Sequence, residues 1–436
     1  MAVTLLPKFV MLKHKSFEHS FFSYKDGTVL AETEMGVHNP LAKIEVEKAK
    51  INGDYVHLRF THTNKYWSRK DGFIVAESTK PEEDVKKSTC TMFKATGTAD
   101  AGVFQLVHVQ SGFFVQSKTT SSQVEVVKDA SESSKLSFVD SETIVLLPNR
   151  LALKSNNGKF LKSVDDSNHS LEFTSDDHNA RSSAQEIQAL PSGQIRIKSV
   201  FYDKFWRRVS DGDGLIYVVS GEKETSDKDS LFWPVKLSEK TIALRSVGND
   251  NGGGARFEVR ELVRERKIYD VKYRLEEARI YDVEPLVAGS VTLRNEGDKE
   301  ASLSEKVVYE EVSSYGISRR ESVTAELKVT FEASLSKVVD FKFEVGRRVS
   351  EELEWEKINY EKVTKEPMAT TDVPARTSVK ISYIGSKGKY TIPFSYSQSD
   401  VDSATALPTI TKHTDGIYHG QGSLELKFVA GKPVPL

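Results

Sequence analysis

Two similar loops carry the side chains best suited to hold a ligand through an apolar surface and polar groups together. The first loop contains Asn64, Tyr66, Trp67 and Arg69, and the second repeats the pattern with Asp203, Phe205, Trp206 and Arg208. A pyranose ring needs a flat apolar surface for its C–H face and fixed donors and acceptors for its hydroxyls. The two loops therefore predict carbohydrate-binding sites.

The two tryptophans also fit a purely structural role. Large aromatic side chains at equivalent positions of a repeat commonly fill the core or cap a barrel. Trp67 and Trp206 are therefore either stacking surfaces for a sugar or packing residues. The sequence alone leaves both interpretations open.

No other group of residues points to catalysis or to a bound cofactor. His57 and His62 lie in an alternating strand pattern, where a histidine is more often solvated or hydrogen-bonded than a metal ligand. The segment 419–423 lacks the strand-to-helix context of a nucleophile elbow. Phosphate loops, metal-ligand spacings and dinucleotide fingerprints do not occur in the sequence. We therefore expect no enzymatic activity, no metal and no cofactor.

Charge and cysteine content narrow the partners and the compartment. The 436 residues include 61 basic and 63 acidic side chains, so no strong field directs the chain to nucleic acid. No apolar run reaches the length of a transmembrane helix, and Pro7 and Lys8 interrupt the N-terminal apolar stretch before it resembles a secretory signal. Cys90 is the single cysteine and cannot form an internal disulfide. We expect a soluble, cytoplasmic protein.

An internal duplication predicts the architecture. Residues 5–13 return as residues 146–154, and the two aromatic loops keep nearly the same offset. Inside the first unit, residues 26–32 recur as 71–77, with a weaker third copy at 113–116. Units of about 140 residues, each made of subunits of about 45 residues with β-rich runs, are typical of a threefold all-β module. The prediction is two tandem β-trefoils.

The duplication is incomplete in the second unit. Leu106 lies 30 residues before Leu136, whereas the matching Leu244 lies only 13 residues before Phe257. The turn-forming string at 249–254 stands where the first unit has additional strand sequence. We expect the second trefoil to lack one hairpin of its third subunit.

The repeated elements resemble a known plant family. The LLP opening, the KYW and KFWRR elements, LFWPV at 231–235 and IALRSVGN at 242–249 resemble the agglutinin domains of amaranthin-like lectins. The resemblance extends from about residue 5 to about residue 263. It implies two β-trefoils, a preference for sugars of the GalNAc type, a role in defence and no catalysis.

The last third of the chain resembles a different module. After about residue 266 the duplication stops, and long alternating segments with many charges follow. Residues 268–282, 373–398 and 415–428 resemble the aerolysin-like module attached to some plant agglutinin domains. This resemblance implies a protomer that binds a surface glycan, oligomerises and inserts one hairpin per subunit into a shared β-barrel.

Residues 323–349 are the predicted membrane-inserting hairpin, because apolar and polar side chains alternate along both arms. The apolar set is Val323, Ala325, Leu327, Val329, Phe331, Ala333 and Leu335 on the first arm, then Val339, Phe341, Phe343 and Val345 on the second. Barrel strands that cross a membrane need about 9 to 11 such residues. A turn centred on Lys337 would place Glu332 opposite Lys342. The same alternation also fits an ordinary hairpin half-buried on its parent sheet.

The whole sequence therefore predicts an all-β protein of three domains: a trefoil at 1–142, a shortened trefoil at 143–264 and an elongated aerolysin-like domain at 265–436. The expected partners are glycans, a target membrane after activation and further copies of the chain. Two alternatives stay open. One is a multivalent lectin whose last domain only mediates oligomerisation, and the other is a glycosidase, for which no carboxylate pair is identifiable.

Overall fold

The chain folds into β-strands and a few short 3-10 helices. The computed structural model describes residues 6–16, 20–32, 36–98, 102–119, 122–165, 169–208, 216–220, 227–238, 240–248, 255–319, 329–331, 351–353, 357–403 and 406–436. These residues contain no α-helix, and accordingly no described helix is long and apolar enough to cross a membrane. They form two compact units, one with the residues up to Arg266 and the segment 399–410, the other with the remainder from Lys267.

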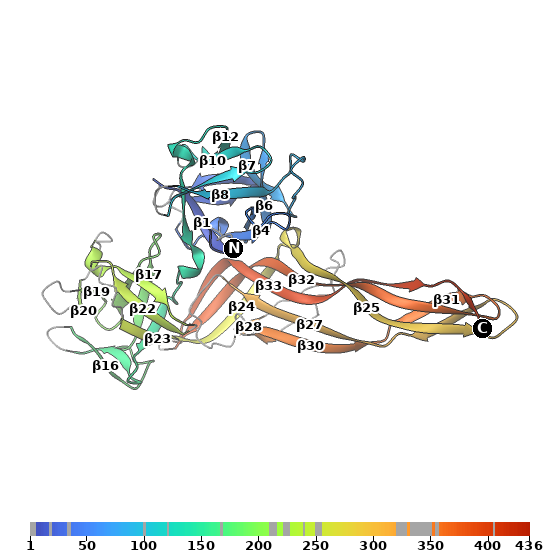
Figure 1. Ribbon diagram of the computed structural model, residues 1–436. Coiled ribbons are helices and arrows are strands. Elements are labelled where there is room, and N and C mark those ends of the chain that lie inside the picture. Colours follow the sequence, from blue (N-terminus) through green and yellow to red (C-terminus); the bar gives the residue numbers. More distant parts are fainter. Residues whose placement is uncertain are drawn as a thin grey trace. The chain divides into compact units, whose positions relative to one another are not determined.

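The first module is a β-trefoil. Strands β1, β4, β5, β8, β9 and β13 pair in a closed ring, and the hairpins β2–β3, β6–β7 and β10–β12 cap it (Figure 1). The strand bounds are β1 (Phe9–His14), β2 (Phe21–Lys25), β3 (Thr28–Glu32), β4 (Ile44–Lys48), β5 (Val56–Phe60), β6 (Lys65–Lys70), β7 (Phe73–Ser78), β8 (Met92–Gly97), β9 (Phe104–His108), β10 (Phe113–Gln116), β11 (Ser122–Gln123), β12 (Glu125–Val127) and β13 (Leu136–Asp140). Three 3-10 helices accompany them: η1 (Pro40–Ala42), η2 (Glu132–Ser134) and η3 (Ser141–Thr143).

The repeated Asp-Gly pairs form the tight turns of two capping hairpins. Asp26 and Gly27 join β2 to β3, and both have positive φ angles, 48° and 84°. Asp71 and Gly72 do the same between β6 and β7, with φ angles of 51° and 85°. Two-residue turns with positive φ at both positions match the twist of antiparallel strands and favour Asp-Gly. The sequence repeat thus corresponds to a repeated structural element.

The second module repeats this ring but lacks one cap. Strands β14, β17, β18, β21, β22 and β23 pair in a closed ring, with β15–β16 and β19–β20 as hairpins. The bounds are β14 (Arg150–Lys154), β15 (Phe160–Ser163), β16 (Leu171–Ser175), β17 (Gln185–Ala189), β18 (Ile195–Ser199), β19 (Lys204–Arg208), β20 (Ile216–Ser220), η4 (Lys228–Ser230), β21 (Phe232–Lys236), β22 (Thr241–Ser246) and β23 (Ala255–Glu261). Among the described residues, β22 pairs directly with β23 and nothing corresponds to β10 and β12. The predicted shortened trefoil is confirmed.

Ion pairs hold the far end of β23 within the same compact unit. Arg266, only 3% exposed, donates from Nε to Asp400 Oδ1 at 2.7 Å and from Nη2 to Glu261 Oε1 at 2.6 Å. Arg150 Nη1 donates to Asp402 Oδ2 at 2.6 Å. A buried guanidinium is tolerated when carboxylates occupy its donors in this way. These contacts lie at the opposite end of β23 from the missing hairpin.

The second unit is built from long antiparallel strands. Its largest sheet has the order β29-β28-β24-β32-β33-β27-β30, with β25 and β34 paired to β32, and β26 pairs separately with β31 (Figure 1). The bounds are β24 (Val263–Tyr273), η5 (Leu275–Glu277), β25 (Arg279–Asn295), β26 (Ala301–Lys306), β27 (Tyr309–Ser318), β28 (Val329–Phe331), β29 (Glu351–Leu353), β30 (Ile358–Lys365), β31 (Met368–Val373), β32 (Thr377–Asp402), β33 (Pro408–Ala430) and β34 (Val434–Pro435). The all-β prediction is therefore confirmed for this part as well.

An aromatic row on β32 organises the core of this sheet. Tyr390, Ile392, Phe394 and Tyr396 alternate along β32 and are all buried. The neighbouring strand β33 contains Gly416 and Gly420, where an added Cβ would collide with the rings of Phe394 and Tyr390. Glycines that admit an aromatic ring from the next strand explain the DGIYHGQG sequence of β33.

Only fragments of the predicted membrane-inserting hairpin are described. Val329 and Phe331 lie in β28, which pairs with β29 so that Val329 is opposite Leu353. A turn centred on Lys337, as predicted for the inserted hairpin, would instead place Val345 opposite Val329, so the described ladder has a different register. Alternation alone cannot detect the difference, because a shift by an even number of residues leaves the same faces together. The other hairpin residues fall outside the described ranges: Val323, Ala325, Leu327, Ala333, Leu335, Val339, Phe341, Phe343 and Val345.

Glycine substitutions on β33 test the aromatic packing. We expect Gly416→Ala and Gly420→Ala each to destabilise the second unit by about 1–3 kcal/mol, because the new methyl group overpacks against a ring. Gly422→Ala is the matched control on the same strand, since its Cβ would approach only Glu311 Oε1, at 3.9 Å. Calorimetric unfolding of the full chain measures the effect. Equal stability of all three variants would contradict this account of the core.

Candidate carbohydrate-binding site

Both predicted tryptophans are core residues. Trp67 is fully buried, and its ring centroid lies 6.1 Å from that of Phe22 and 5.7 Å from that of Phe60. Trp206 is 2% exposed and donates from Nε1 to Gln185 Oε1 at 3.1 Å. Neither ring offers a face to a sugar. The interpretation of the tryptophans as stacking surfaces is therefore wrong, and the packing alternative is confirmed.

Asn64 and Tyr66 of the first loop belong to a buried polar network. Tyr66 is 1% exposed, and its hydroxyl donates to Glu47 Oε2 at 3.0 Å. Arg59, itself 4% exposed, donates from Nε to Glu47 Oε1 at 2.8 Å and also contacts Glu45 and Asn64. These groups satisfy one another, as buried polar groups must. The first loop therefore presents no aromatic face beside its polar groups.

Arg69, the fourth predicted residue of this loop, is half-buried. Its guanidinium carbon lies 5.4 Å from the centroid of the Phe113 ring. A cation above a ring at this distance stabilises the local packing. Arg69 thus joins β6 to β10 and is separate from the Tyr66 network.

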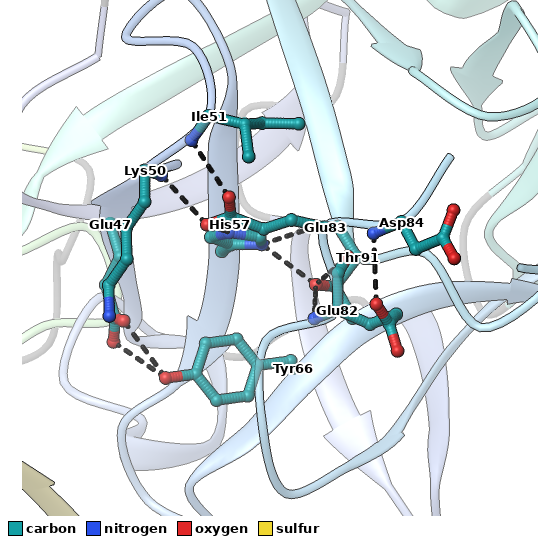
Figure 2. Close-up of polar contacts among 9 residues, drawn as sticks. All are labelled: Glu47, Lys50, Ile51, His57, Tyr66, Glu82, Glu83, Asp84 and Thr91. Atoms are coloured by element: carbon teal, nitrogen blue, oxygen red, sulfur yellow. Dashed lines mark hydrogen bonds and ion pairs between the residues drawn. The ribbon is translucent and has the colours of Figure 1, made fainter. Parts of the chain in front are cut away.

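A second polar group in this module fastens the loop between β4 and β5 (Figure 2). Glu83 accepts the backbone N–H of Lys50 at 2.8 Å and of Ile51 at 2.9 Å. Its Oε1 lies 3.2 Å from Nε2 of the buried His57, and His57 Nδ1 lies 2.8 Å from Thr91 Oγ1. Burial acts to raise the pKa of Glu83, but these hydrogen bonds outweigh it and lower the pKa.

The second loop is more open than the first. Phe205 is half-buried, and the guanidinium carbon of Arg196 lies 3.8 Å from its ring centroid. Asp203 is exposed at the turn and pairs with Lys198 at 2.5 Å. Arg208 donates from Nη2 to Asp229 Oδ1 at 2.8 Å and to the carbonyl of Gly248 at 3.1 Å. This loop therefore combines a partly accessible ring with charged neighbours.

Sequence reasoning missed three residues that complete this arrangement. Arg207 donates from Nε to Asp227 Oδ2 at 2.9 Å, and Asp227 in turn accepts the backbone N–H of Asp229 at 3.0 Å. The two aspartates belong to the start of η4, which the fold brings beside β19. Arg207 was identifiable from its place in the KFWRR element, but nothing in the sequence links η4 to that loop.

We call Phe205, Arg207, Arg208, Asp227 and Asp229 the second-module cluster. The Arg207 and Arg208 side chains are 41% and 16% exposed, and those of Asp227 and Asp229 are 27% and 21% exposed. The hydrogen bond from Arg207 lowers the pKa of Asp227 and keeps its carboxylate ionised. Ionised carboxylates accept hydrogen bonds from hydroxyl groups and guanidiniums donate to hydroxyl oxygens, so the cluster can hydrogen-bond a sugar from the strand that carries the half-buried Phe205 ring.

The described residues offer no group of three His, Cys, Asp or Glu side chains that could hold a metal ion. The clustered carboxylates are instead matched by guanidinium groups. The chemistry available at the second-module cluster is therefore hydrogen bonding and ring stacking.

Comparison with known proteins identifies one domain. Residues 28–147 match the family model of the agglutinin domain, which places an agglutinin domain in the first module. Among curated proteins, none matches the chain significantly.

Several solved structures are similar to parts of the chain at low identity. A mosquitocidal holotoxin is 11% identical with a TM-score of 0.31, and the match covers 62% of this chain and 36% of the holotoxin, so the chain spans about a third of that protein's length. Lamprey immune protein is 11% identical with a TM-score of 0.30, and the match covers 76% of this chain and 87% of the lamprey protein. The aerolysin-like protein of Bombina maxima is 9% identical with a TM-score of 0.25, and the match covers 39% of this chain and 99% of the Bombina protein. These TM-scores are too low to establish a shared fold.

A pH-dependent stability measurement tests the Glu83 contacts. Because its pKa is lower in the folded chain than in the unfolded chain, Glu83 stabilises the fold above its unfolded pKa of about 4.3. That contribution disappears as the pH falls through the folded pKa. We expect Glu83→Gln to cost about 1 kcal/mol at neutral pH and progressively less below about pH 4. Asp54→Asn, an exposed carboxylate of the same loop, is the control, and a cost independent of pH would refute the assignment.

Proposed function

Starting from the agglutinin domain in the first module, we propose that the chain is a non-enzymatic lectin that binds a sugar at the second-module cluster. The observation that carries the proposal is the half-buried ring of Phe205, against which the Arg196 guanidinium packs. The same strand carries Arg207 and Arg208, which are held by aspartate carboxylates. The second trefoil is a copy of the first, so a binding role for one module extends naturally to the other. The resemblance to amaranthin-like lectins makes GalNAc-type sugars the expected class.

Removal of the ring tests this site. Phe205→Ala should weaken glycan binding by about 1–3 kcal/mol, roughly tenfold to a hundredfold, because one apolar contact with the sugar is lost. Phe428→Ala is the matched control, since Phe428 is 36% exposed on β33, outside both trefoil modules. Titration of folded variants on a glycan array measures both affinities. Unchanged affinity together with unchanged total binding at saturation in Phe205→Ala would refute the site.

We further propose that the protein oligomerises on a glycan-bearing membrane and inserts the hairpin at 323–349. The ladder between β27 and β30 supports this, since it pairs Tyr309 with Lys365 and Gly316 with Ile358. Continued in the same register, it would place Val345 opposite Val329 and a turn near Lys337. That is the register predicted from the sequence for an inserted hairpin.

The described part of the hairpin has another register and another place in the sheet. Val329 pairs with Leu353, and β28 lies beside β24, whereas β27 lies beside β33. Formation of one continuous hairpin from β27 to β30 therefore requires that β28 and β29 separate and pair again eight residues out of their present register. The proposed pore and the present fold are thus distinguishable by cross-linking.

Two cysteine pairs separate the registers. Thr330→Cys with Glu352→Cys joins residues that are opposite each other now, and its oxidised form should block dye release from glycan-bearing liposomes until reductant is added. Thr330→Cys with Glu344→Cys joins residues that would be opposite each other in the continuous hairpin. Its disulfide should form only after insertion. Undiminished leakage from the verified oxidised first pair would assign any pore to another segment.

The second candidate is a multivalent lectin whose C-terminal domain mediates oligomerisation without a pore. Its supporting observation is the edge strand β30, on which Ile358 and Tyr360 are 56% and 76% exposed. An exposed edge strand with apolar side chains is suited to pairing with another chain. Oligomers that bind glycans but release no dye would favour this function.

A further inference from the structure

We propose that the outward face of the β10–β12 hairpin is a second, separate sugar site, which would make each chain bivalent. The inference rests on the proposed lectin function but not on the second-module cluster. The β10–β12 ladder pairs Phe114 with Val127 and Gln116 with Glu125. Between them, Val115 and Val126 are buried in the barrel core. Because side chains alternate along a strand, Phe114, Gln116 and Glu125 share the outer face.

The polar groups on this face are held in place before any ligand binds. Gln116, 3% exposed, donates from Nε2 to Glu125 Oε1 at 2.7 Å, while its Oε1 accepts the Ser131 hydroxyl at 3.1 Å. Lys118 Nζ lies 3.0 Å from Glu125 Oε1. The Glu125 side chain remains 26% exposed and Lys118 65% exposed. A sugar would therefore meet a fixed acceptor and a flexible donor.

A half-buried ring lies beside these groups. Phe114 lies on β10, the strand that also carries Gln116, and its side chain is partly exposed. Its ring can cover the C–H face of a pyranose while Glu125 accepts hydrogen bonds from two neighbouring hydroxyl groups and Lys118 donates to a hydroxyl oxygen. The balance of one ammonium and one carboxylate suits a neutral sugar with vicinal hydroxyls.

The threefold symmetry of the module shows that this combination occurs at one hairpin of the three. Equivalent lysine–glutamate pairs occupy the other hairpins, Lys25–Glu32 at 4.0 Å and Lys70–Glu77 at 3.1 Å. The aromatic residues at the equivalents of Phe114 are buried there, since Phe21 is 2% exposed and Tyr66 is 1% exposed. Exposed ion pairs contribute little binding or folding energy by themselves. The third hairpin is therefore distinguished by the accessible ring of Phe114 and the buried side-chain amide of Gln116.

The shortened second module explains why this site is separate from the second-module cluster. Among its described strands, nothing corresponds to β10 and β12, so the face with Phe114 has no copy there. Each trefoil would therefore contribute one sugar site, built on a different subunit of the repeat.

The test uses the full chain with the second-module cluster disabled by Phe205→Ala. Immobilised GalNAc-terminated and galactose-terminated neutral glycans are the probes. Adding Glu125→Gln, or separately Phe114→Ala, should weaken the remaining binding at least tenfold. Adding Glu77→Gln, the equivalent carboxylate of the second hairpin, should leave it unchanged. Melting temperatures within a few degrees of the parent would show that each variant is folded.

The outcomes separate this inference from the proposed function. If Phe205→Ala still binds and both Glu125→Gln and Phe114→Ala bind equally well, the second site is refuted while the lectin function stands. Equal losses with Glu125→Gln and Glu77→Gln would also refute it, because any surface carboxylate would then serve. If the unmodified chain binds neither type of probe, the lectin function and the second site fail together.

Discussion

Each trefoil depends on filling the centre of a closed ring of strands with an apolar side chain from each capping hairpin. In the first module Phe22, Trp67 and Val115 meet this requirement, and in the second Leu161 and Trp206 do so. Burial of such side chains supplies most of the stability of a small barrel. The same burial determines which neighbours point outward, because side chains alternate along a strand. The side chains proposed to bind a ligand are therefore placed by core packing.

This constraint explains both what the sequence predicted and what it missed. The duplication, the repeat of 26–32 as 71–77 and the missing hairpin were visible because they are local patterns with fixed spacing. Trp67 and Trp206 attracted a functional interpretation because composition cannot distinguish a buried ring from an accessible one. Asp227 and Asp229 were missed because their proximity to Arg207 is created only by the tertiary fold. The register of β28 and β29 was missed because alternation repeats every two residues.

The two modules have diverged in how they use equivalent positions. In the first, the loop around Tyr66 is closed by carboxylates, and Arg59 occupies the interior of that network. In the second, Phe205 replaces the tyrosine, has no hydroxyl to satisfy and remains half-buried. Loss of the third hairpin then removes one outer face from the second module alone. A duplicated fold thus gives two surfaces of different chemistry, and binding at one need not resemble binding at the other.

The described pairs of two ladders in the C-terminal unit differ in register, and the difference bears on how the proposed hairpin could pair again. The described ladder between β28 and β29 pairs residues 329–331 with 351–353, whereas that between β27 and β30 runs from Tyr309 to Gly316. Every ladder pair contributes backbone hydrogen bonds and cross-strand contacts. In the proposed insertion, β27 and β30 stay paired while β28 and β29 open. The surviving ladder then sets the register in which the released segment pairs again, because extension of an existing ladder avoids the entropic cost of closing a new loop.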